Sequence, residues 1–339
     1  MGITSEILLH FPEDGRHLTG KYIRGVVRFQ LDKETVFKKI SLSLVQTGFC
    51  EWYDRVRRDR NERHKRIGNM LQGHESAVPI KIYFLNKKVD DNVTLSAGSY
   101  EYPYEMEIPQ NIPPSFRSQN GKIKYHLVLK FKKPGLLKRT KSIQTEVQIF
   151  PQVDPSIIDA PTAFALDKNL TKMFASNNQE IRIIGELEKP YLSYYNENKL
   201  SLAVTNNTDL NFTIKTELRS KVTYTHDHSM GMHGDEEFVK EVIGPIYESP
   251  VVPDNSVSNI IKVILPVDPQ QYTVRHSAII SREYKLKVTI QMPMPHRNVS
   301  VNIPVFVGDR RLTKANAENQ NNEAVKEPPT YWHVMSEDK

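Results

Sequence analysis

Hydrophobic and polar positions alternate with a period of two in many short segments of this chain. Residues 123–131 (IKYHLVLKF) and 284–290 (YKLKVTI) show the alternation most clearly, and residues 41–44, 199–204 and 298–303 repeat it. Successive side chains of a β-strand point to opposite faces of the sheet. The pattern therefore predicts strands with one face in a core and the other in water.

Turn residues separate these segments, and valine, isoleucine, threonine, tyrosine and phenylalanine are common within them. Both features are typical of strands. No stretch sustains the 3.6-residue period of an amphipathic helix, and the nearest candidate lies around residues 163–174. The sequence therefore predicts an all-β protein and favours sandwiches over a doubly wound sheet.

The strand-like segments fill two regions of similar size, residues 1–154 and 180–309. Residues 155–179 lie between them, contain prolines and an Asn pair, and show little alternation, which predicts an inter-domain connector. Residues 310–339 are rich in Asn, Glu and Ala and poor in apolar side chains, which predicts a disordered tail. We therefore expect two β-sandwiches in tandem, followed by the tail.

The composition, with 38% hydrophobic and 25% charged residues, fits a soluble folded chain. Cys50 is the single cysteine, so we expect no internal disulfide and a thiol that packs beside Trp52 as a small apolar group. The first residues lack a basic stretch followed by an apolar run, and no apolar run approaches the length of a membrane span. These features predict an intracellular, cytoplasmic protein.

The formal net charge of +6 is distributed unevenly along the chain. Residues 1–154 carry 26 basic and 17 acidic side chains, a net charge of +9, whereas residues 155–309 carry 15 and 18. The last 30 residues carry five of each. A basic first half predicts an acidic partner there: phospholipid, phosphopeptide or nucleic acid.

Two stretches, residues 55–66 and 130–141, hold much of this positive charge, and the second runs from a strand into Pro134-Gly135, a predicted hairpin tip. A solvated loop and an anion-binding surface explain these stretches about equally well. Nucleic acid fits less well, because interleaved aromatic residues and a binding motif are missing. The residues assigned to contact with acidic lipid or cargo are Arg57, Arg58, Arg60, Lys130, Lys132, Lys133, Lys138 and Arg139.

The segment 95–109 (LSAGSYEYPYEMEIP) continues with residues 112–116 (IPPSF) and 121–125 (GKIKY). This order, a glycine before an aromatic-rich strand that ends in proline, then Pro-Pro-Ser-Phe, then a glycine and a tyrosine-bearing strand, resembles the arrestin N-domain. Upstream, residues 22–52 resemble the opening strands of that domain through Tyr22–Val27, Ile40–Leu44, Gly48 and Trp52. Residues 303–308 (IPVFVG) resemble the last strand of the arrestin C-domain. The resemblance implies two tandem arrestin-like, immunoglobulin-type β-sandwich domains.

The tail contains one Pro-Pro-x-Tyr sequence, residues 328–331, followed directly by Trp332. This ending resembles the alpha-arrestins, the arrestin domain-containing proteins. Prolines pre-set the polyproline II conformation that the aromatic groove of a WW domain binds, and the tyrosine ring would fill a second pocket. Residues 113–116 and 269–272 lack the full motif, so we interpret both as structural. The predicted WW-binding residues are Pro328, Pro329 and Tyr331.

The resemblance implies a non-catalytic adaptor that links membrane-protein cargo, such as receptors or transporters, to WW-domain HECT-type ubiquitin ligases. Such an adaptor promotes cargo ubiquitination, endocytosis and endosomal sorting, and it is recruited from the cytoplasm to the plasma membrane and endosomes. The alternative is a retromer-like or coat-associated trafficking scaffold that acts without a ligase.

The histidines of one polar segment, His226, His228 and His233, have a spacing that can hold a metal ion. Glycine and serine surround them, however, so a loop joining two strands is the preferred interpretation. The sequence contains no nucleophile elbow, phosphate-binding glycine loop, metalloprotease helix or dinucleotide fingerprint. We therefore expect no catalytic residue, metal or cofactor, and a metal-binding sandwich stays a third hypothesis.

Overall fold

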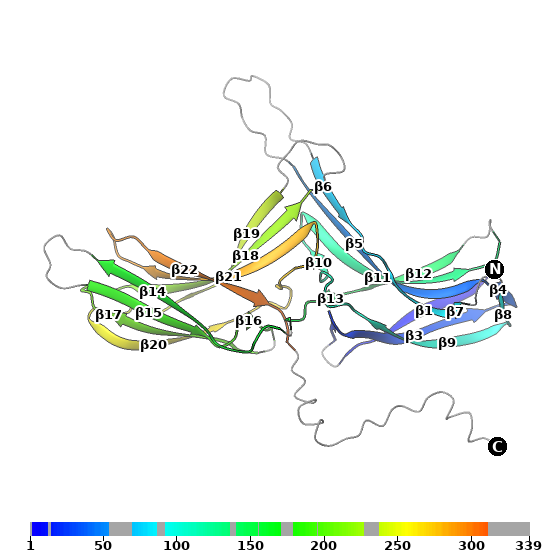
Figure 1. Ribbon diagram of the computed structural model, residues 1–339, viewed down its shortest axis with the longest axis horizontal. Coiled ribbons are helices and arrows are strands. Elements are labelled where there is room, and N and C mark those ends of the chain that lie inside the picture. The colour runs from blue at the N-terminus through cyan, green and yellow to red at the C-terminus, as the bar shows by residue number, and fades with distance from the viewer. Residues whose placement is uncertain are drawn as a thin grey trace, which may run out of the picture. The chain divides into compact units, whose positions relative to one another are not determined.

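The computed structural model describes residues 2–12, 15–53, 70–86, 92–135, 140–154, 156–170, 179–194, 196–226 and 237–310 (Figure 1). Within these ranges the regular elements are β-strands and none is a helix, which confirms the all-β prediction. The same ranges accordingly contain no helix that is long and apolar enough to cross a membrane.

The first sandwich is built from the N-terminal strands, which form two main sheets and two short pairs. One sheet has the strand order β1-β3-β9. The other has six strands in the order β10-β11-β5-β6, with β12 on β11 and β7 on β5. The strands are β1 (Ile3–His10), β2 (His17–Leu18), β3 (Tyr22–Leu31), β4 (Thr35–Phe37), β5 (Lys39–Tyr53), β6 (Met70–Glu75), β7 (Ile80–Asn86), β8 (Val93–Leu95), β9 (Gly98–Glu107), β10 (Phe116–Arg117), β11 (Gly121–Lys132), β12 (Lys141–Val147) and β13 (Ile149–Phe150).

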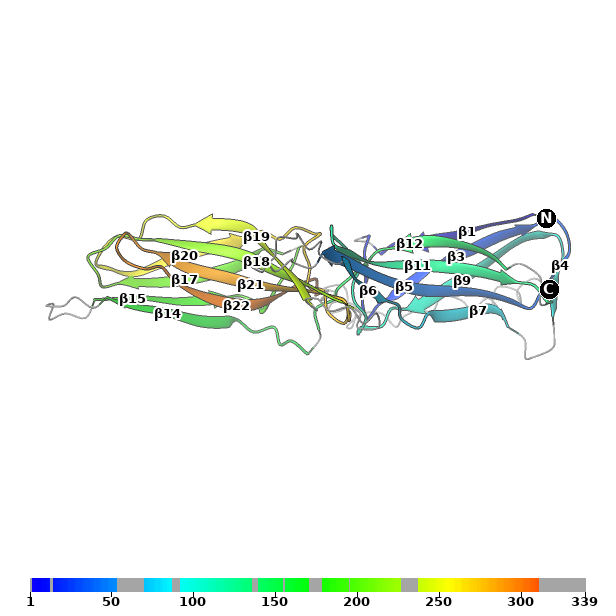
Figure 2. The ribbon, with the colours of Figure 1, turned by 90° about the horizontal axis from the view of Figure 1, so that it is seen from above.

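The core of the first sandwich lies between its two sheets. Phe29 of β3 and Phe131 of β11 meet there edge to face, with ring centroids 5.1 Å apart. Along β11, the odd-numbered residues from Ile123 to Phe131 are buried, whereas the outward Lys130 and Lys132 are exposed. The period of two therefore placed the inward side chains of this strand correctly. From above, β11 lies between β5 and β12 (Figure 2).

The second sandwich pairs a four-stranded sheet, β14-β15-β17-β20, with a five-stranded sheet, β16-β22-β21-β18-β19. Buried side chains from both sheets, among them Ile183 and Leu286, form its core. The strands are β14 (Thr162–Leu170), β15 (Gln179–Leu187), β16 (Tyr191–Leu192), β17 (Asn198–Asn206), β18 (Thr213–Thr225), β19 (Glu237–Glu248), β20 (Ser256–Leu265), β21 (Ile280–Gln291) and β22 (Val299–Val307). The expected tandem sandwiches are thus confirmed.

One expectation from the sequence is wrong in this region. Residues 162–170 were assigned to the connector, with a helical candidate nearby, but they form β14, an edge strand paired antiparallel with β15. Ala163 and Ala165 occupy outward positions of β14, next to the inward Phe164 and Leu166. Apolar residues on both faces hide the alternation that identified the other strands.

The contacts divide the chain into two compact units, residues 1–309 and residues 310–339. The two sandwiches belong to one unit because they share buried side chains. The core of the first sandwich includes Tyr224 of β18 together with Tyr272, Val274, Ile279 and Ile280 from the second sandwich. Apart from Arg310, the predicted tail lies outside the described residues.

Candidate functional site

The structure describes some of the predicted site residues and not others. Lys130 and Lys132 lie on β11, and Lys133 follows that strand directly. The following predicted residues lie outside the described ranges: Arg57, Arg58, Arg60, Lys138, Arg139, Pro328, Pro329 and Tyr331.

Lys130 and Lys132 belong to a larger positively charged surface, which we call the basic sheet face. It is the outward face of the six-stranded sheet of the first sandwich. The strand registers place further cations from β5, β7, β10 and β11 on this face. Its basic residues are Lys39, Lys81, Arg117, Lys122, Lys124, Lys130 and Lys132. The sequence interpretation missed Lys122 and Lys124, although their even-numbered positions on β11 carried the signal.

Acidic side chains balance this positive charge only in part, because the same face carries Glu51 of β5 and Glu146 of β12 against the seven cations. The Lys124 ammonium lies 2.9 Å from the Glu146 carboxylate, and this hydrogen bond lowers the pKa of Glu146. Lys39 lies over the Tyr83 ring, 4.2 Å from its centroid, which is a cation–π contact. Within the described ranges Lys130 and Lys132 form no ion pair, so the basic sheet face keeps a net positive charge.

The opposite sheet of the first sandwich differs, because its outward arginines are paired. The Arg24 guanidinium lies 2.7 Å from the Glu105 carboxylate. Arg28 lies 2.5 Å from Glu101 and 4.0 Å from Glu6 on the other neighbouring strand. The excess positive charge of the described part of the first sandwich is therefore concentrated on one of its two sheets.

Cys50 lies at the junction of the two sandwiches. Its thiol is fully buried on the same face of β5 as Trp52, which confirms the expected packing. The sulfur lies 3.5 Å from the carbonyl oxygen of Thr225 and 3.7 Å from that of Ile279, both in the second sandwich. Burial raises the pKa of the thiol to about 11, so it is protonated and unreactive near neutral pH.

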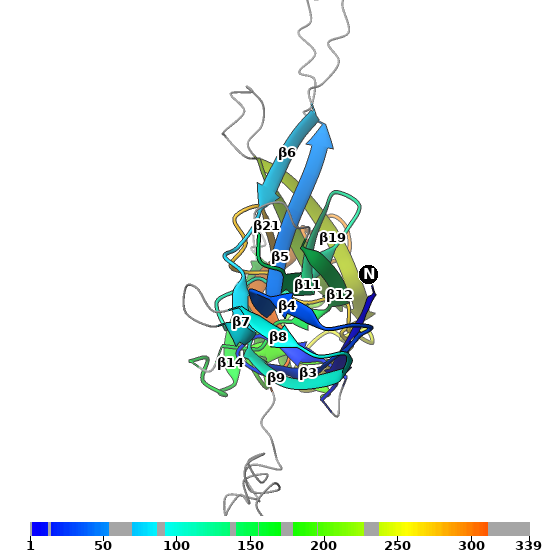
Figure 3. The ribbon, with the colours of Figure 1, turned by 90° about the vertical axis from the view of Figure 1, so that its right-hand side faces the viewer.

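Glu75 connects the sandwiches from the neighbouring strand. Figure 3 shows β6, which ends at Glu75, lying beside β5. The Glu75 carboxylate accepts a hydrogen bond of 2.8 Å from Gln46 within the first sandwich. It also accepts bonds of 2.5 Å from the Ser277 hydroxyl and 3.0 Å from the Ala278 amide. Hydrogen bonds to a charged acceptor are stronger than neutral ones, so Glu75 holds the 277–278 segment in place.

The two proline-containing segments that we interpreted as structural meet at the same junction. Tyr125 donates a 2.5 Å hydrogen bond to the Pro113 carbonyl. The Ser115 hydroxyl accepts a bond of 2.9 Å from the Ile149 amide, and the Ser115 carbonyl accepts one from Tyr272. Both segments therefore have the structural role that the sequence analysis expected.

A cavity of about 310 Å³ opens beside this contact, between the two sandwiches. Phe306 and Ile112 contribute apolar walls, and Gln110 and Gln152 contribute side-chain amides. The Arg275 guanidinium lies 5.2 Å from the centre of the Phe306 ring. Asp154 and His276 also line the cavity, so it presents groups of both charge signs together with neutral amides and does not select one chemical class of ligand.

His226 also lies at the junction. Its side chain is buried, and its Nδ1 lies 3.0 Å from the carbonyl oxygen of Gln72 on β6. His226 of the second sandwich therefore contacts the first sandwich. His228 and His233 lie outside the described residues, so the three-histidine ligand set stays a hypothesis.

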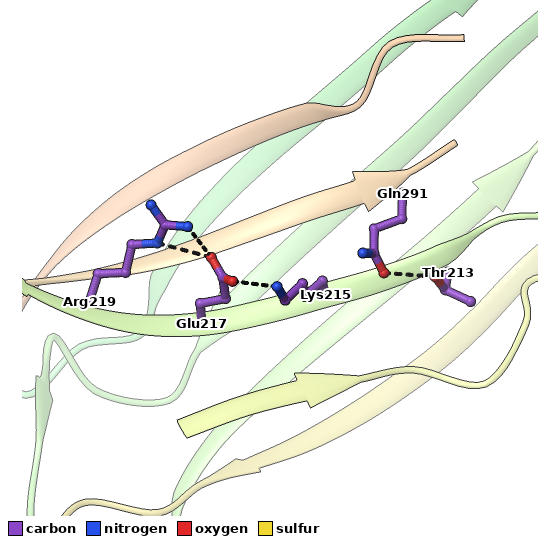
Figure 4. Close-up of polar contacts among 5 residues, drawn as sticks. All are labelled: Thr213, Lys215, Glu217, Arg219 and Gln291. Atoms are coloured by element: carbon purple, nitrogen blue, oxygen red, sulfur yellow. Dashed lines mark hydrogen bonds and ion pairs between the residues drawn. The ribbon is translucent and has the colours of Figure 1, made fainter. Parts of the chain in front are cut away.

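A buried carboxylate lies on the five-stranded sheet of the second sandwich (Figure 4). The Glu217 side chain is only 4% exposed, and its carboxylate lies 2.6 Å from both Lys215 Nζ and Arg219 Nη2. The hydrogen bond from Lys215, and then that from Arg219, lowers the pKa of Glu217. Thr213 and Gln291 form a separate hydrogen bond of 3.0 Å farther along β18. The charge pattern is that of a paired structural cluster.

Comparison with known proteins adds to this geometry. The family model described as "Arrestin (or S-antigen), N-terminal domain" matches residues 9–156, most of the first sandwich. A second family model, Rgp1, matches residues 92–223. Arrestin domain-containing protein 5 of Bos taurus is 29% identical over 129 residues, and that of Homo sapiens is 28% identical over the same length.

These relatives are matched only in part. Each alignment covers 37% of this chain, and it covers 36% of the bovine protein and 34% of the human protein. The matched region thus spans about a third of the length of each relative.

Proposed function

Since this chain belongs to the alpha-arrestin family of arrestin domain-containing proteins, we propose that it is a non-catalytic adaptor. It links membrane-protein cargo to WW-domain HECT-type ubiquitin ligases. Two observations support the proposal. The chain has two tandem β-sandwiches, the first of which matches the arrestin N-terminal domain, and it has a Pro-Pro-x-Tyr sequence at residues 328–331.

The folded body provides the cargo-binding part of the adaptor. Its two sandwiches are held together by contacts of Cys50, Glu75 and Tyr272, so a bound cargo tail would meet a preformed surface. Preformed surfaces bind with a smaller loss of conformational freedom than segments that must become ordered. The cargo itself is a receptor or transporter at the plasma membrane or on endosomes.

The ligase-binding part is the motif Pro328, Pro329 and Tyr331. It lies 19 to 22 positions beyond Asp309, the last residue of the folded unit. That length of chain separates a WW domain from the sandwiches while keeping both on one molecule. The residues 310–339 carry no net charge, so recognition of the motif depends on the shape of its prolines and tyrosine.

Catalysis belongs to the ligase in this proposal, and the adaptor contributes proximity. Binding cargo and ligase at once raises the effective concentration of the ligase at cargo lysines. Ubiquitination then directs the cargo to endocytosis and endosomal sorting. With a single motif, one chain binds one WW domain, so bivalent binding to tandem WW domains requires a second chain.

A calorimetric titration of the full chain with a WW domain of a HECT ligase tests the proposal. We expect binding by the wild type and its loss in Tyr331→Ala, because the tyrosine pocket then stays empty. The matched control is Tyr53→Ala, which removes a tyrosine that is 70% exposed outside the tail, and it should bind as the wild type does. Unchanged binding of Tyr331→Ala would contradict the proposal and favour the ligase-free trafficking scaffold.

A further inference from the structure

We propose that the basic sheet face docks on a membrane surface rich in anionic phospholipid. The inference rests on the proposed function in one respect, because an adaptor for membrane-protein cargo must work beside a bilayer. The surface includes Lys39, Lys81 and Lys122 in addition to the lysines that sequence reasoning selected.

The sheet itself brings these cations into one surface. On β11, Lys122, Lys130 and Lys132 share the outward face because they occupy even-numbered positions. Lys132 pairs with Lys39 on β5, and Lys81 lies opposite Ser43. Neighbouring strands lie about 5 Å apart, and alternate residues along a strand lie about 7 Å apart. The ammonium groups therefore form a two-dimensional array on this face of the sheet.

Short polar residues separate the lysines on this face. Ser41 and Ser43 lie on β5, directly opposite Lys130 and Val128 of β11. Both serines are buried, so the longer lysine side chains stand above them. Long, flexible lysines above small neighbours form a surface that can meet the lipid headgroups of a bilayer at several points.

The kinds of charged residue favour a membrane over a phosphopeptide. Six of the seven cations are lysines, and Arg117 is the exception. Arginine binds phosphate through a planar pair of donors, which suits a defined phosphate group. Lysine acts as a point charge, and each lysine near an anionic bilayer contributes about fivefold in binding, which is about 1 kcal/mol.

Exposed aromatic and sulfur-containing side chains lie on the same face. Tyr83 pairs with Ser41 and is 44% exposed. Tyr53 and Met70 lie opposite each other at the other end of the sheet and are 70% and 43% exposed. Tyrosine rings combine an apolar body with a polar hydroxyl, and they favour the boundary between lipid and water.

The difference in charge between the two sheets of the first sandwich also determines which sheet faces the bilayer. The outward arginines of the opposite sheet, Arg24 and Arg28, are paired with glutamates, whereas Lys130 and Lys132 form no ion pair within the described ranges. An anionic bilayer therefore attracts the first sandwich through the six-stranded sheet.

Sedimentation of the full chain with lipid vesicles tests this proposal. The vesicles contain either phosphatidylcholine alone or phosphatidylcholine with phosphatidylserine. We expect binding to the second kind only, and weaker binding as salt rises, because the contacts are exposed. The variant K130Q/K132Q should bind about 25-fold more weakly, at about fivefold for each lysine. The matched control K199Q/K262Q removes two exposed lysines of the second sandwich and should bind like the wild type.

Three results would overturn the proposal. The first is absence of wild-type binding to phosphatidylserine vesicles, and the second is equal binding by K130Q/K132Q and the wild type. The third is binding to a soluble acidic phosphopeptide without binding to vesicles, which would identify a peptide site. The Tyr331→Ala variant should bind vesicles normally, and K130Q/K132Q should bind WW domains normally. The two assays therefore test membrane docking and ligase binding independently of each other.

Discussion

The Tyr272 hydroxyl of the second sandwich donates a hydrogen bond of 2.5 Å to the Ser115 carbonyl oxygen of the first. Tyr272 is buried, and its ring also packs edge to face against Phe150, with centroids 5.6 Å apart. Both partners lie in segments where prolines occur without a complete WW-binding motif. The contact explains these segments as parts of the junction between the sandwiches.

Tyr272→Phe tests the contribution of this bond. The ring stays, but the buried carbonyl of Ser115 loses its donor, so we expect a loss of about 1 kcal/mol in the free energy of unfolding. Denaturant unfolding of the full chain measures it. The control, Tyr22→Phe, changes a tyrosine that is 46% exposed and should leave stability unchanged. Equal stability of Tyr272→Phe and wild type would mean that the bond does not stabilise the junction.

The single thiol, Cys50, reports on whether the sandwiches stay together. Burial raises its pKa to about 11, so iodoacetamide at about pH 8 should modify the folded chain far more slowly than the unfolded chain. Mass spectrometry follows the reaction without ambiguity because the chain has one cysteine. Modification of the folded chain at the rate of a free thiol would show that the junction opens readily.

Glu217 should be a strong determinant of stability in the second sandwich. Glu217→Gln leaves Lys215 and Arg219 without their counter-charge in a site that is 4% exposed, and we expect a loss of about 2 kcal/mol. Because the folded-state pKa is lowered, the ionised pair stabilises the fold above the ordinary pKa of glutamate and loses this effect as the pH falls. Thermal unfolding at about pH 7 measures the change. The exposed control Glu186→Gln should unfold like the wild type, and a Glu217→Gln variant as stable as the wild type would refute the prediction.

His17 should make the first sandwich sensitive to mild acid. Its ring is 2% exposed, neither ring nitrogen has a hydrogen-bond partner in the described part of the chain, and burial lowers its pKa. The unfolded imidazole takes up a proton near pH 6.5 and the folded one only at lower pH. Stability therefore falls as the pH drops below about 6.5.

The variant His17→Phe removes the imidazole that takes up the proton and keeps an aromatic ring beside Phe11. Its melting temperature should change less between about pH 7 and pH 5 than that of the wild type. His10→Phe, which changes an exposed histidine nearby, should keep the wild-type dependence. A His17→Phe profile parallel to the wild type would assign the acid sensitivity to other groups.

Local patterns predicted strands where buried apolar residues alternate with polar ones, but they did not predict the contacts between distant segments. The alternation from Ile123 to Phe131 identified β11 because its lysines contrast with buried apolar residues. It failed for β14, where Ala163 and Ala165 face outward.

The candidate sites show the same difference between what local sequence predicts and what only the fold brings together. Sequence reasoning found Lys130 and Lys132 from charge density, but Lys39 and Lys81 join them only through the strand register. The junction contacts of Cys50 span more than 170 positions, and no local pattern encodes them. The Pro-Pro-x-Tyr sequence at residues 328–331 is the opposite case, because local sequence alone identifies it, and its binding to a WW domain stays a prediction.

Proximity labelling in cells, with the wild type compared with Tyr331→Ala, tests the adaptor function most directly. The wild type should label both HECT-type ubiquitin ligases and membrane proteins. Tyr331→Ala should lose the ligases and keep the membrane proteins, because the folded body is unchanged. Ligase labelling by Tyr331→Ala at the wild-type level would contradict the two-ended adaptor.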